Sequence, residues 1–169
     1  MRDWRIDRVG SCERGENPMV IARMRSGFAV MGDTQFQPGY CLLLASPQVA
    51  KLEDLPPAER AIFLEDMGTL GAARERGVSS RASQLCDLRQ HGCLSSRHVF
   101  PRYVWEDPER ARRSVWLYPQ ENWSDADKAY TAEKHGALRV AITAALGHAQ
   151  KDCTSSSIYR VARDNVLRS

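Results

Sequence analysis

Two short apolar runs near the start of the chain predict a pair of β-strands. Residues 27–32 read GFAVMG, and residues 40–45 read YCLLLA and are closely followed by Pro47. Continuous apolar runs of this length, bounded by glycine or proline, are typical of buried strands. Pro38 and Gly39 form a turn signal between the two runs. The strands are therefore expected to pair as an antiparallel hairpin.

Apolar residues at helical spacing predict two long helices. Residues 57–75 open with a proline and place apolar side chains such as Phe63 on one face and charged side chains on the others. Residues 126–148 show a second helical pattern, for which Ser124 or Asp125 is the expected N-cap. Both stretches are predicted to be amphipathic helices that pack on the sheet.

The remaining segments are less regular. Residues 1–24 are polar and mixed, and we expect a short helix followed by a loop. Residues 77–97 show neither strand alternation nor a helical stripe, although residues 98–101 resume a strand-like pattern without a partner before them. We predict an α+β fold with an antiparallel sheet of about five strands, a long helix and a C-terminal helix. Residues 1–150 are expected to form a single domain, and residues 151–169 a polar tail.

Composition narrows the class of protein. Hydrophobic residues make up 43% of the 169 residues and charged residues 27%, which is ordinary for a soluble globular domain. No apolar run approaches the roughly 18 residues of a membrane span, and the charged residues 1–5 do not resemble a secretion signal. The net charge is only +3, and no nucleic-acid-binding motif is present. Five cysteines without C-x-x-C pairing suggest reduced thiols in the cytoplasm.

A histidine near the middle of the chain lies in a recognisable context. Residues 98–103 read HVFPRY. They resemble the end of the histidine triad signature, His-φ-His-φ-His-φ-φ, in the branch of that nucleotide hydrolase family where a Pro-Arg pair follows. Other segments resemble the same family in their order and spacing, namely residues 28–31, 38–40, 52–55 and 116–119. The resemblance covers roughly residues 26–103 and implies a histidine-triad-like fold.

The resemblance also implies an activity. Family members cut the α-phosphate of a nucleotide from a leaving group, as in nucleotide conjugates and dinucleoside polyphosphates such as diadenosine polyphosphates. The middle histidine attacks phosphorus and forms a nucleotidyl-histidine, which water resolves. The usual mechanism needs neither a metal nor another cofactor. The expected partners are therefore a small nucleotide ligand and a second copy of the chain in a homodimer, without nucleic acid or membrane.

The catalytic positions of this chain depart from the family pattern. Carried over residue by residue, His98 is the third triad position, Ser96 the middle position and Leu94 the first. A serine hydroxyl is a poor nucleophile without a base. His91 is a candidate base, although a polar loop histidine explains it equally well. The chain is therefore expected to be an impaired hydrolase or a non-catalytic nucleotide-binding relative.

Three residues are candidates for nucleotide binding by the same resemblance. Asp33, preceded by Gly32, follows the first strand of the hairpin, where family members hold the ribose with an acidic or amide side chain. An ordinary turn aspartate is the alternative interpretation. Gln90 lies near the place where the family has a phosphate-binding amide, but it does not match the family register.

The departure is concentrated in one block, which suggests a further hypothesis. Permitted codons for residues 84–97, read one base later, can encode NYAIYGNTDACLH, which contains an alternating strand and a histidine at position 96. Paired frameshifts would produce the chain as it stands. The chain would then be the inactive product of a frame-disrupted gene, and the nucleotide sequence across codons 74–98 tests this directly.

Overall fold

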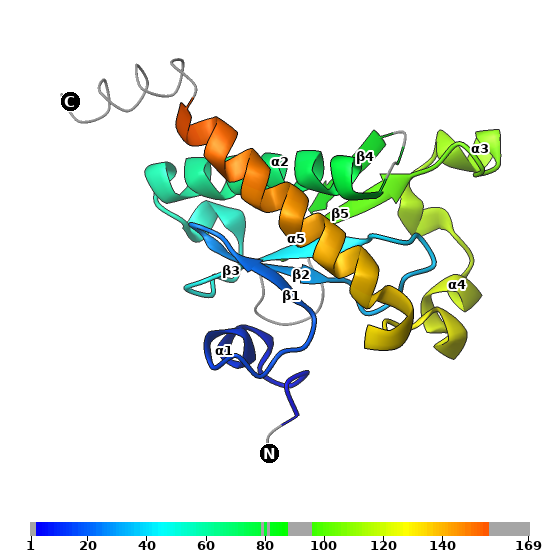
Figure 1. The fold of residues 1–169 in the computed structure, drawn as a ribbon, viewed down its shortest axis with the longest axis horizontal. Helices are drawn as coiled ribbons and strands as arrows, with labels where there is room; N and C mark the ends of the chain where they lie inside the picture. The colour runs from blue at the N-terminus through cyan, green and yellow to red at the C-terminus, as the bar shows by residue number, and fades with distance from the viewer. Residues whose placement is uncertain (1–2, 79, 81, 88–95, 156–169) are drawn as a thin grey trace.

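The computed structural model describes residues 3–78, 80, 82–87 and 96–155, with side chains as far as residue 149. Five strands form one sheet in the order β1-β2-β3-β5-β4, and every neighbouring pair is antiparallel. Figure 1 shows the sheet with the long helices α2 and α5 crossing over it. The strands are β1 (Val20–Arg23), β2 (Gly27–Met31), β3 (Cys41–Ala45), β4 (Ala82–Asp87) and β5 (Ser96–Arg102). The α-helices are α1 (Arg8–Glu13), α2 (Pro57–Val78), α3 (Pro108–Ala111), α4 (Gln120–Ser124) and α5 (Ala132–Ser155).

The register of the central strands places Ser96 and His98 on one face of the sheet. β3 pairs with β5 so that Leu42 lies opposite His98 and Leu44 opposite Ser96. Directly paired residues of an antiparallel sheet share a face, and the face changes with each step along a strand. Ser96 and His98 therefore point to the same side of the sheet, beside the apolar side chains of β3.

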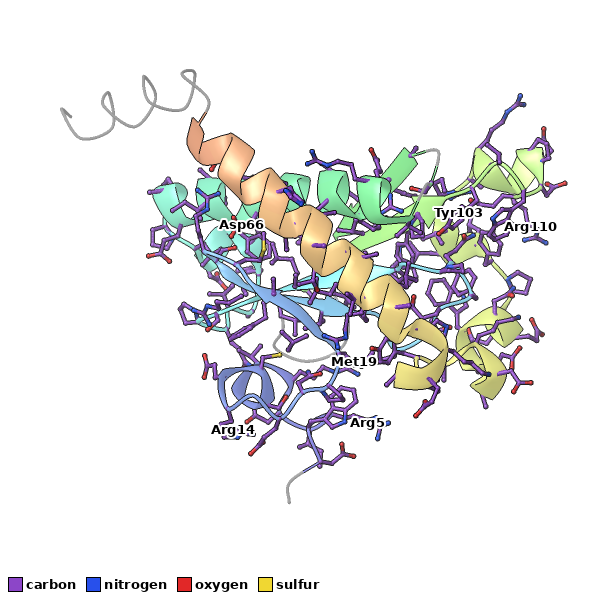
Figure 2. All side chains as sticks on the ribbon, viewed as in Figure 1. Arg5, Arg14, Met19, Asp66, Tyr103 and Arg110 are labelled. Atoms are coloured by element: carbon purple, nitrogen blue, oxygen red, sulfur yellow. The ribbon has the colours of Figure 1, made fainter. Side chains whose placement is uncertain are left out.

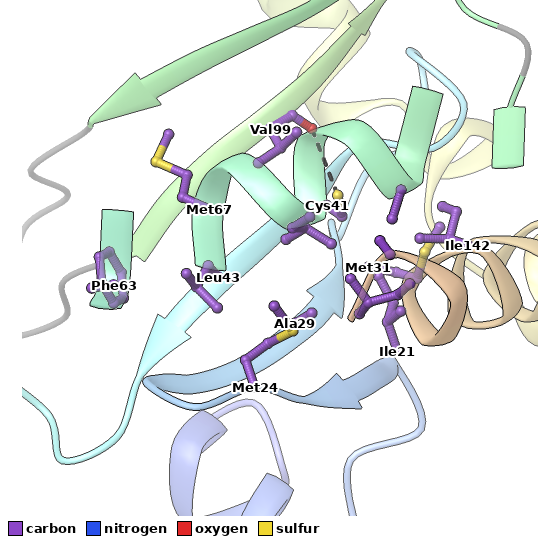
Figure 3. Packing of buried hydrophobic residues seen from close by; sticks show 14 of the residues in the cluster. Ile21, Met24, Ala29, Met31, Cys41, Leu43, Phe63, Met67, Val99 and Ile142 are labelled. Atoms are coloured by element: carbon purple, nitrogen blue, oxygen red, sulfur yellow. Dashed lines mark hydrogen bonds between the residues drawn. The ribbon is translucent and has the colours of Figure 1, made fainter. Parts of the chain in front are cut away.

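The opposite face of the sheet is covered by α2 and α5 and holds the larger core. Figure 3 shows Leu43 and Val99 of the sheet, Phe63 of α2 and Ile142 of α5 among the side chains of this core. Phe63, Leu43 and Ile142 are fully buried. The two helices approach each other closely at Gly77, where an added Cβ would lie 3.1 Å from the Ile142 backbone. Burial on this face fixes the sheet that carries the site.

A buried carboxylate ties α2 to the tight turn between β1 and β2. Asp66, labelled in Figure 2, accepts hydrogen bonds from the Ser26 backbone N–H at 2.8 Å and the Ser26 hydroxyl at 2.7 Å. Arg25 Nε donates to the same carboxylate at 3.0 Å. Since Asp66 is 3% exposed, these charge-assisted bonds anchor the hairpin on the helix.

The α+β prediction, with its five-stranded antiparallel sheet, long helix and C-terminal helix, is confirmed. The hairpin of residues 27–45 is also confirmed, with Gly27 opposite Ala45 and Met31 opposite Cys41. The helix predicted over 57–75 is observed and continues to Val78. No helix in the described residues combines the length and apolar character that crossing a bilayer requires.

The irregular block was misinterpreted in part. Ala82–Asp87 forms β4, a strand that the pattern of residues 77–97 did not predict. β4 lies at the edge of the sheet and pairs with β5 alone. An edge strand needs no continuous apolar run, because it forms backbone hydrogen bonds to a neighbouring strand along one edge only and its side chains are less buried. The strand expected from the fold is therefore present in the chain as written.

Near the two ends of the chain, the observed elements also differ from the predicted ones. Residues 1–24 contain the predicted short helix, α1, but the predicted loop includes β1. The final helix begins at Ala132 rather than 126, because Asp125 accepts from the Asp127 N–H and caps a short 3-10 turn instead. It continues to Ser155, past the predicted end at 148. The division into a domain and a polar tail at residue 150 stays a prediction.

Candidate functional site

A pocket of about 550 Å³ lies on the face of the sheet that α2 and α5 leave open. Its floor is formed by the sheet, through Leu42 and Leu44 of β3 and Ser96 and His98 of β5. Tyr40, which directly precedes β3, completes the floor. A cavity of this size holds a small-molecule ligand with a few placed polar groups.

Three side chains of the floor form a hydrogen-bonded chain. The Ser96 hydroxyl lies 3.3 Å from His98 Nε2, and the Tyr40 hydroxyl lies 2.5 Å from His98 Nδ1. Among the described residues, the imidazole beside Ser96 is that of His98, two positions along the same strand face. Tyr40 also stacks on Phe100, with ring centroids 4.0 Å apart, which helps to fix the orientation of its ring.

The environment of the pocket floor keeps these three hydrogen-bonded side chains uncharged at neutral pH. His98 is 1% exposed, and burial together with the positive charge of Arg97 lowers its pKa to about 4. Burial raises the pKa of Tyr40 well above 10, so its hydroxyl stays protonated at neutral pH. The imidazole is therefore uncharged in the folded protein, with one ring nitrogen toward Ser96 and the other toward Tyr40.

The lowered pKa of His98 predicts a pH-dependent stability. In the unfolded chain the imidazole titrates near 6.5, so the unfolded state takes up a proton first as the pH falls. The stabilisation is fully present above pH 6.5 and is lost as the pH falls towards 4. A shift of this size is worth about 3 kcal/mol.

Urea unfolding of the wild type and of His98→Gln at pH 7 and pH 4 measures this effect. The wild type is expected to lose about 3 kcal/mol more than the variant over that interval. His148→Gln, at an exposed position of α5, is the control and should follow the wild type. Equal pH dependence of the wild type and His98→Gln would contradict a buried neutral imidazole.

One wall of the pocket is aromatic. Trp116 and Trp123 both line it, and their rings stack with centroids 4.7 Å apart and planes 10° from parallel. The edge contact of Trp116 with His98, at 5.2 Å between ring centroids, places this wall directly beside the floor. The sequence marked residues 116–119 only by resemblance, and Trp123 carried no signal.

The aromatic wall is held by a buried ion pair. Arg102 Nη2 lies 2.9 Å from Glu106 Oε2, and the Glu106 side chain is fully buried. The Tyr118 hydroxyl donates to Glu106 Oε2 at 2.6 Å, and the Tyr103 N–H donates to Glu106 Oε1 at 2.6 Å. Glu106 thereby ties the segment that carries Trp116 to the end of β5.

The pocket lining also contains an ion pair between distant parts of the chain. Asp33, in the loop after β2, lines the pocket, and its contact with ribose stays a prediction. Both of its carboxylate oxygens accept from Arg8 of α1, with 2.9 Å between Nη1 and Oδ1 and a second, shorter contact from Nη2 to Oδ2. Arg8 also lines the pocket, and nothing in the sequence marked it.

Gly32 lies beside the floor rather than in the pocket lining. An added Cβ at this position would overlap the Tyr40 ring, whose Cγ would be only 2.8 Å away. Because Tyr40 is 6% exposed and packed on Phe100, its ring has little room to move. Glycine at position 32 therefore gives Tyr40 the space to reach His98.

Replacing Gly32 with alanine is expected to displace Tyr40 and break its hydrogen bond to His98. The cost of such overpacking is about 1–3 kcal/mol of unfolding free energy, measurable by urea denaturation. Gly68→Ala, at a position of α2 with open space around it, is the matched control and should not destabilise the protein. An unchanged unfolding midpoint for Gly32→Ala would mean that the Tyr40 ring is not confined.

The remaining candidates are not placed. Gln90, His91 and Leu94 lie outside the described residues, so the phosphate-binding amide and the first triad position stay predictions. Within the part of the chain that the structure describes, no cluster of three or more His, Cys, Asp or Glu side chains is arranged to hold a metal ion.

Comparison with known proteins connects this geometry to one fold. No protein-family model and no curated protein sequence matches the chain. A histidine triad protein from Sinorhizobium meliloti matches in structure with a TM-score of 0.63 and 15% identity, over 85% of this chain and 95% of that protein. A hypothetical histidine triad nucleotide-binding protein from Sulfolobus tokodaii gives 0.63 and 12%, over 83% and 91%. A histidine triad protein from Bradyrhizobium japonicum gives 0.63 and 15%, over 79% and 94%. The chain therefore has the fold of the histidine triad proteins.

Proposed function

We propose that the pocket binds a nucleotide with its α-phosphate over Ser96 and His98, and that the chain is an impaired hydrolase of nucleotide conjugates or dinucleoside polyphosphates. The observation that carries the proposal is the 3.3 Å contact between Ser96 Oγ and His98 Nε2 on the pocket floor. A hydroxyl and an imidazole nitrogen so close together are suited to binding phosphate oxygens. The nucleotide-binding description of the Sulfolobus tokodaii protein, which has the same fold, supports the ligand class.

The impairment follows from the chemistry of the same contact. Attack by Ser96 requires a base, and His98, with its pKa lowered to about 4, is a weak one. Efficient Ser-His pairs have a carboxylate on the far ring nitrogen, which stabilises the imidazolium that forms. Here that nitrogen contacts the neutral hydroxyl of Tyr40. The site is therefore better suited to binding than to turnover.

Two measurements on the unaltered chain test the proposal. Thermal unfolding with adenosine 5′-monophosphate should show a concentration-dependent rise in Tm, since a ligand of the native state stabilises it. Incubation with an adenosine phosphoramidate or diadenosine polyphosphate should give negligible release of product. Ser96→Ala is the matched control and should release product no more slowly than the wild type. Rapid turnover that Ser96→Ala abolishes would refute the impairment.

The frame-disrupted gene product remains the alternative. A chain without function of its own predicts no nucleotide-dependent rise in Tm, so the same thermal experiment separates the two. Sequencing of the gene across residues 84–97 tests the frameshift itself.

We also propose that the chain forms a homodimer in the cytoplasm. Support for self-association comes from β4, an edge strand whose Leu85 is 47% exposed, because edge strands offer unpaired backbone groups. Support for a reducing compartment comes from Cys12, Cys41 and Cys86, which are free thiols. Sedimentation equilibrium of the wild type and Leu85→Lys tests the dimer, which the added charge should weaken.

A further inference from the structure

Arg8 is the one arginine or lysine among the described residues that line the pocket. It comes from α1, a short helix held on the sheet through the buried side chains of Val9 and Cys12. Its side chain keeps 26% of its surface exposed. The other charged residues of the lining are Asp33 and Asp125, both acidic.

The two acidic residues differ in how exposed they are to a ligand. Asp125 caps the 3-10 turn through the Asp127 N–H at 2.9 Å and pairs with Lys128 at 3.2 Å. Asp33 pairs with Arg8 alone among the described side chains, and its own side chain is 56% exposed. Each carboxylate makes two contacts and keeps lone pairs for additional donors, and Asp33 is the more exposed of the two, at 56% against 36%.

The Arg8 guanidinium also has unused capacity. It carries five N–H groups in a fixed fork, and the contacts to Asp33 use two of them. No other described residue accepts a hydrogen bond from it. The remaining N–H groups can donate to an anionic ligand while the pair with Asp33 stays closed.

The pair lies close to the polar part of the floor. The negative charge of Asp33 raises the pKa of the Tyr40 hydroxyl, and the positive charge of Arg8 lowers it. That hydroxyl lies 2.5 Å from His98, which in turn contacts Ser96. Arg8, Ser96 and His98 line the same pocket, so one ligand can contact all three.

We propose that Arg8 binds the phosphate of a nucleoside 5′-phosphate while its ion pair with Asp33 stays closed. This inference rests on the proposed nucleotide-binding function and deepens it. Arg8 makes the pocket selective for the phosphorylated form of the nucleoside. Arg8 of α1 then adds phosphate affinity to the contacts that Ser96 and His98 of β5 make.

Equilibrium binding of adenosine and adenosine 5′-monophosphate by calorimetry tests the proposal. The wild type should bind the monophosphate more tightly than adenosine. Arg8→Gln should weaken binding of the monophosphate on the order of tenfold and leave adenosine within about twofold. Arg14→Gln is the matched control, since Arg14, labelled in Figure 2, also lies at α1 and is ion-paired, with Asp7 and Glu16, but does not line the pocket. It should bind both ligands as the wild type does.

The double variant Arg8→Gln/Asp33→Asn separates a phosphate contact from simple charge neutralisation. Removing Arg8 alone exposes the negative charge of Asp33, which repels phosphate. If the double variant still fails to prefer the monophosphate, Arg8 itself binds the phosphate. If the double variant regains the preference, or if Arg8→Gln weakens both ligands equally, the inference is wrong while nucleotide binding stands. A wild type that binds neither ligand removes the proposed function and this inference together.

Discussion

Ser96→His is expected to raise the release of product from an adenosine phosphoramidate by on the order of a hundredfold or more, because loss of a nucleophile is among the largest effects of a single residue on an enzyme. An imidazole is neutral and nucleophilic near pH 7 and needs no separate base. Because Ser96 lines the pocket, the larger histidine side chain has room to extend towards the ligand. His98, two residues further along the same strand, would then contact the phosphate oxygens.

The expected intermediate gives the measurement a second readout. When the reaction of Ser96→His is quenched at alkaline pH, mass spectrometry of the intact protein should reveal a covalent nucleotidyl adduct. Ser96→Ala cannot form this adduct. Adding His98→Asn to Ser96→His should lower the gain. A variant that still shows the nucleotide-dependent rise in Tm, yet gains neither adduct nor turnover, would show that position 96 is not the nucleophile position.

Glu106→Gln is expected to destabilise the protein by about 3–5 kcal/mol, which is typical when one partner of a buried ion pair is removed. The substitution leaves the Arg102 guanidinium, with a side chain only 9% exposed, without its carboxylate. For a chain of this length the corresponding fall in Tm is roughly 10 °C. Urea and thermal unfolding followed by circular dichroism measure both quantities.

The control for this prediction is a similar pair at the surface. Glu109 and Arg112 lie 3.3 Å apart with side chains 70% and 77% exposed, so Glu109→Gln should change stability little. Because Glu106 also holds the segment of Trp116, Glu106→Gln should weaken nucleotide binding in addition. Equal stabilities for Glu106→Gln and Glu109→Gln would mean that the buried carboxylate does not stabilise the wall.

The parts of the fold that the sequence predicted are those where burial is nearly complete. β2 and β3 are buried at every position, which is reflected in the apolar runs of residues 27–32 and 40–45. β1 escaped prediction because it has four residues and ends at the exposed Arg23. β4 escaped because its sequence, ASQLCD, alternates weakly and exposes Leu85. Local patterns report burial, so strands with partial burial leave a weak signal.

The site was predicted only where a motif carried it. Ser96, His98 and Asp33 followed from the resemblance, and the structure brings all three to the pocket lining. Tyr40 was counted as the start of a strand, yet it contacts His98 across 58 residues of sequence. Arg8 reaches Asp33 across 25 residues. Contacts of this kind depend on tertiary structure, and one sequence without its relatives gives no indication of them.

The position of β4 at the rim of the sheet has a consequence for how the chain tolerates change. β4 has one strand neighbour, whereas β3 has two and lies over the central core. A rim strand accepts new side chains with little effect on the rest of the packing. Residues 82–87 of the block that departs from the family pattern therefore lie where the scaffold is least constrained, whereas Ser96 lies in β5, between β3 and β4. Changes in β4 are therefore tolerated more easily than changes at position 96, where the side chain is buried between two neighbouring strands.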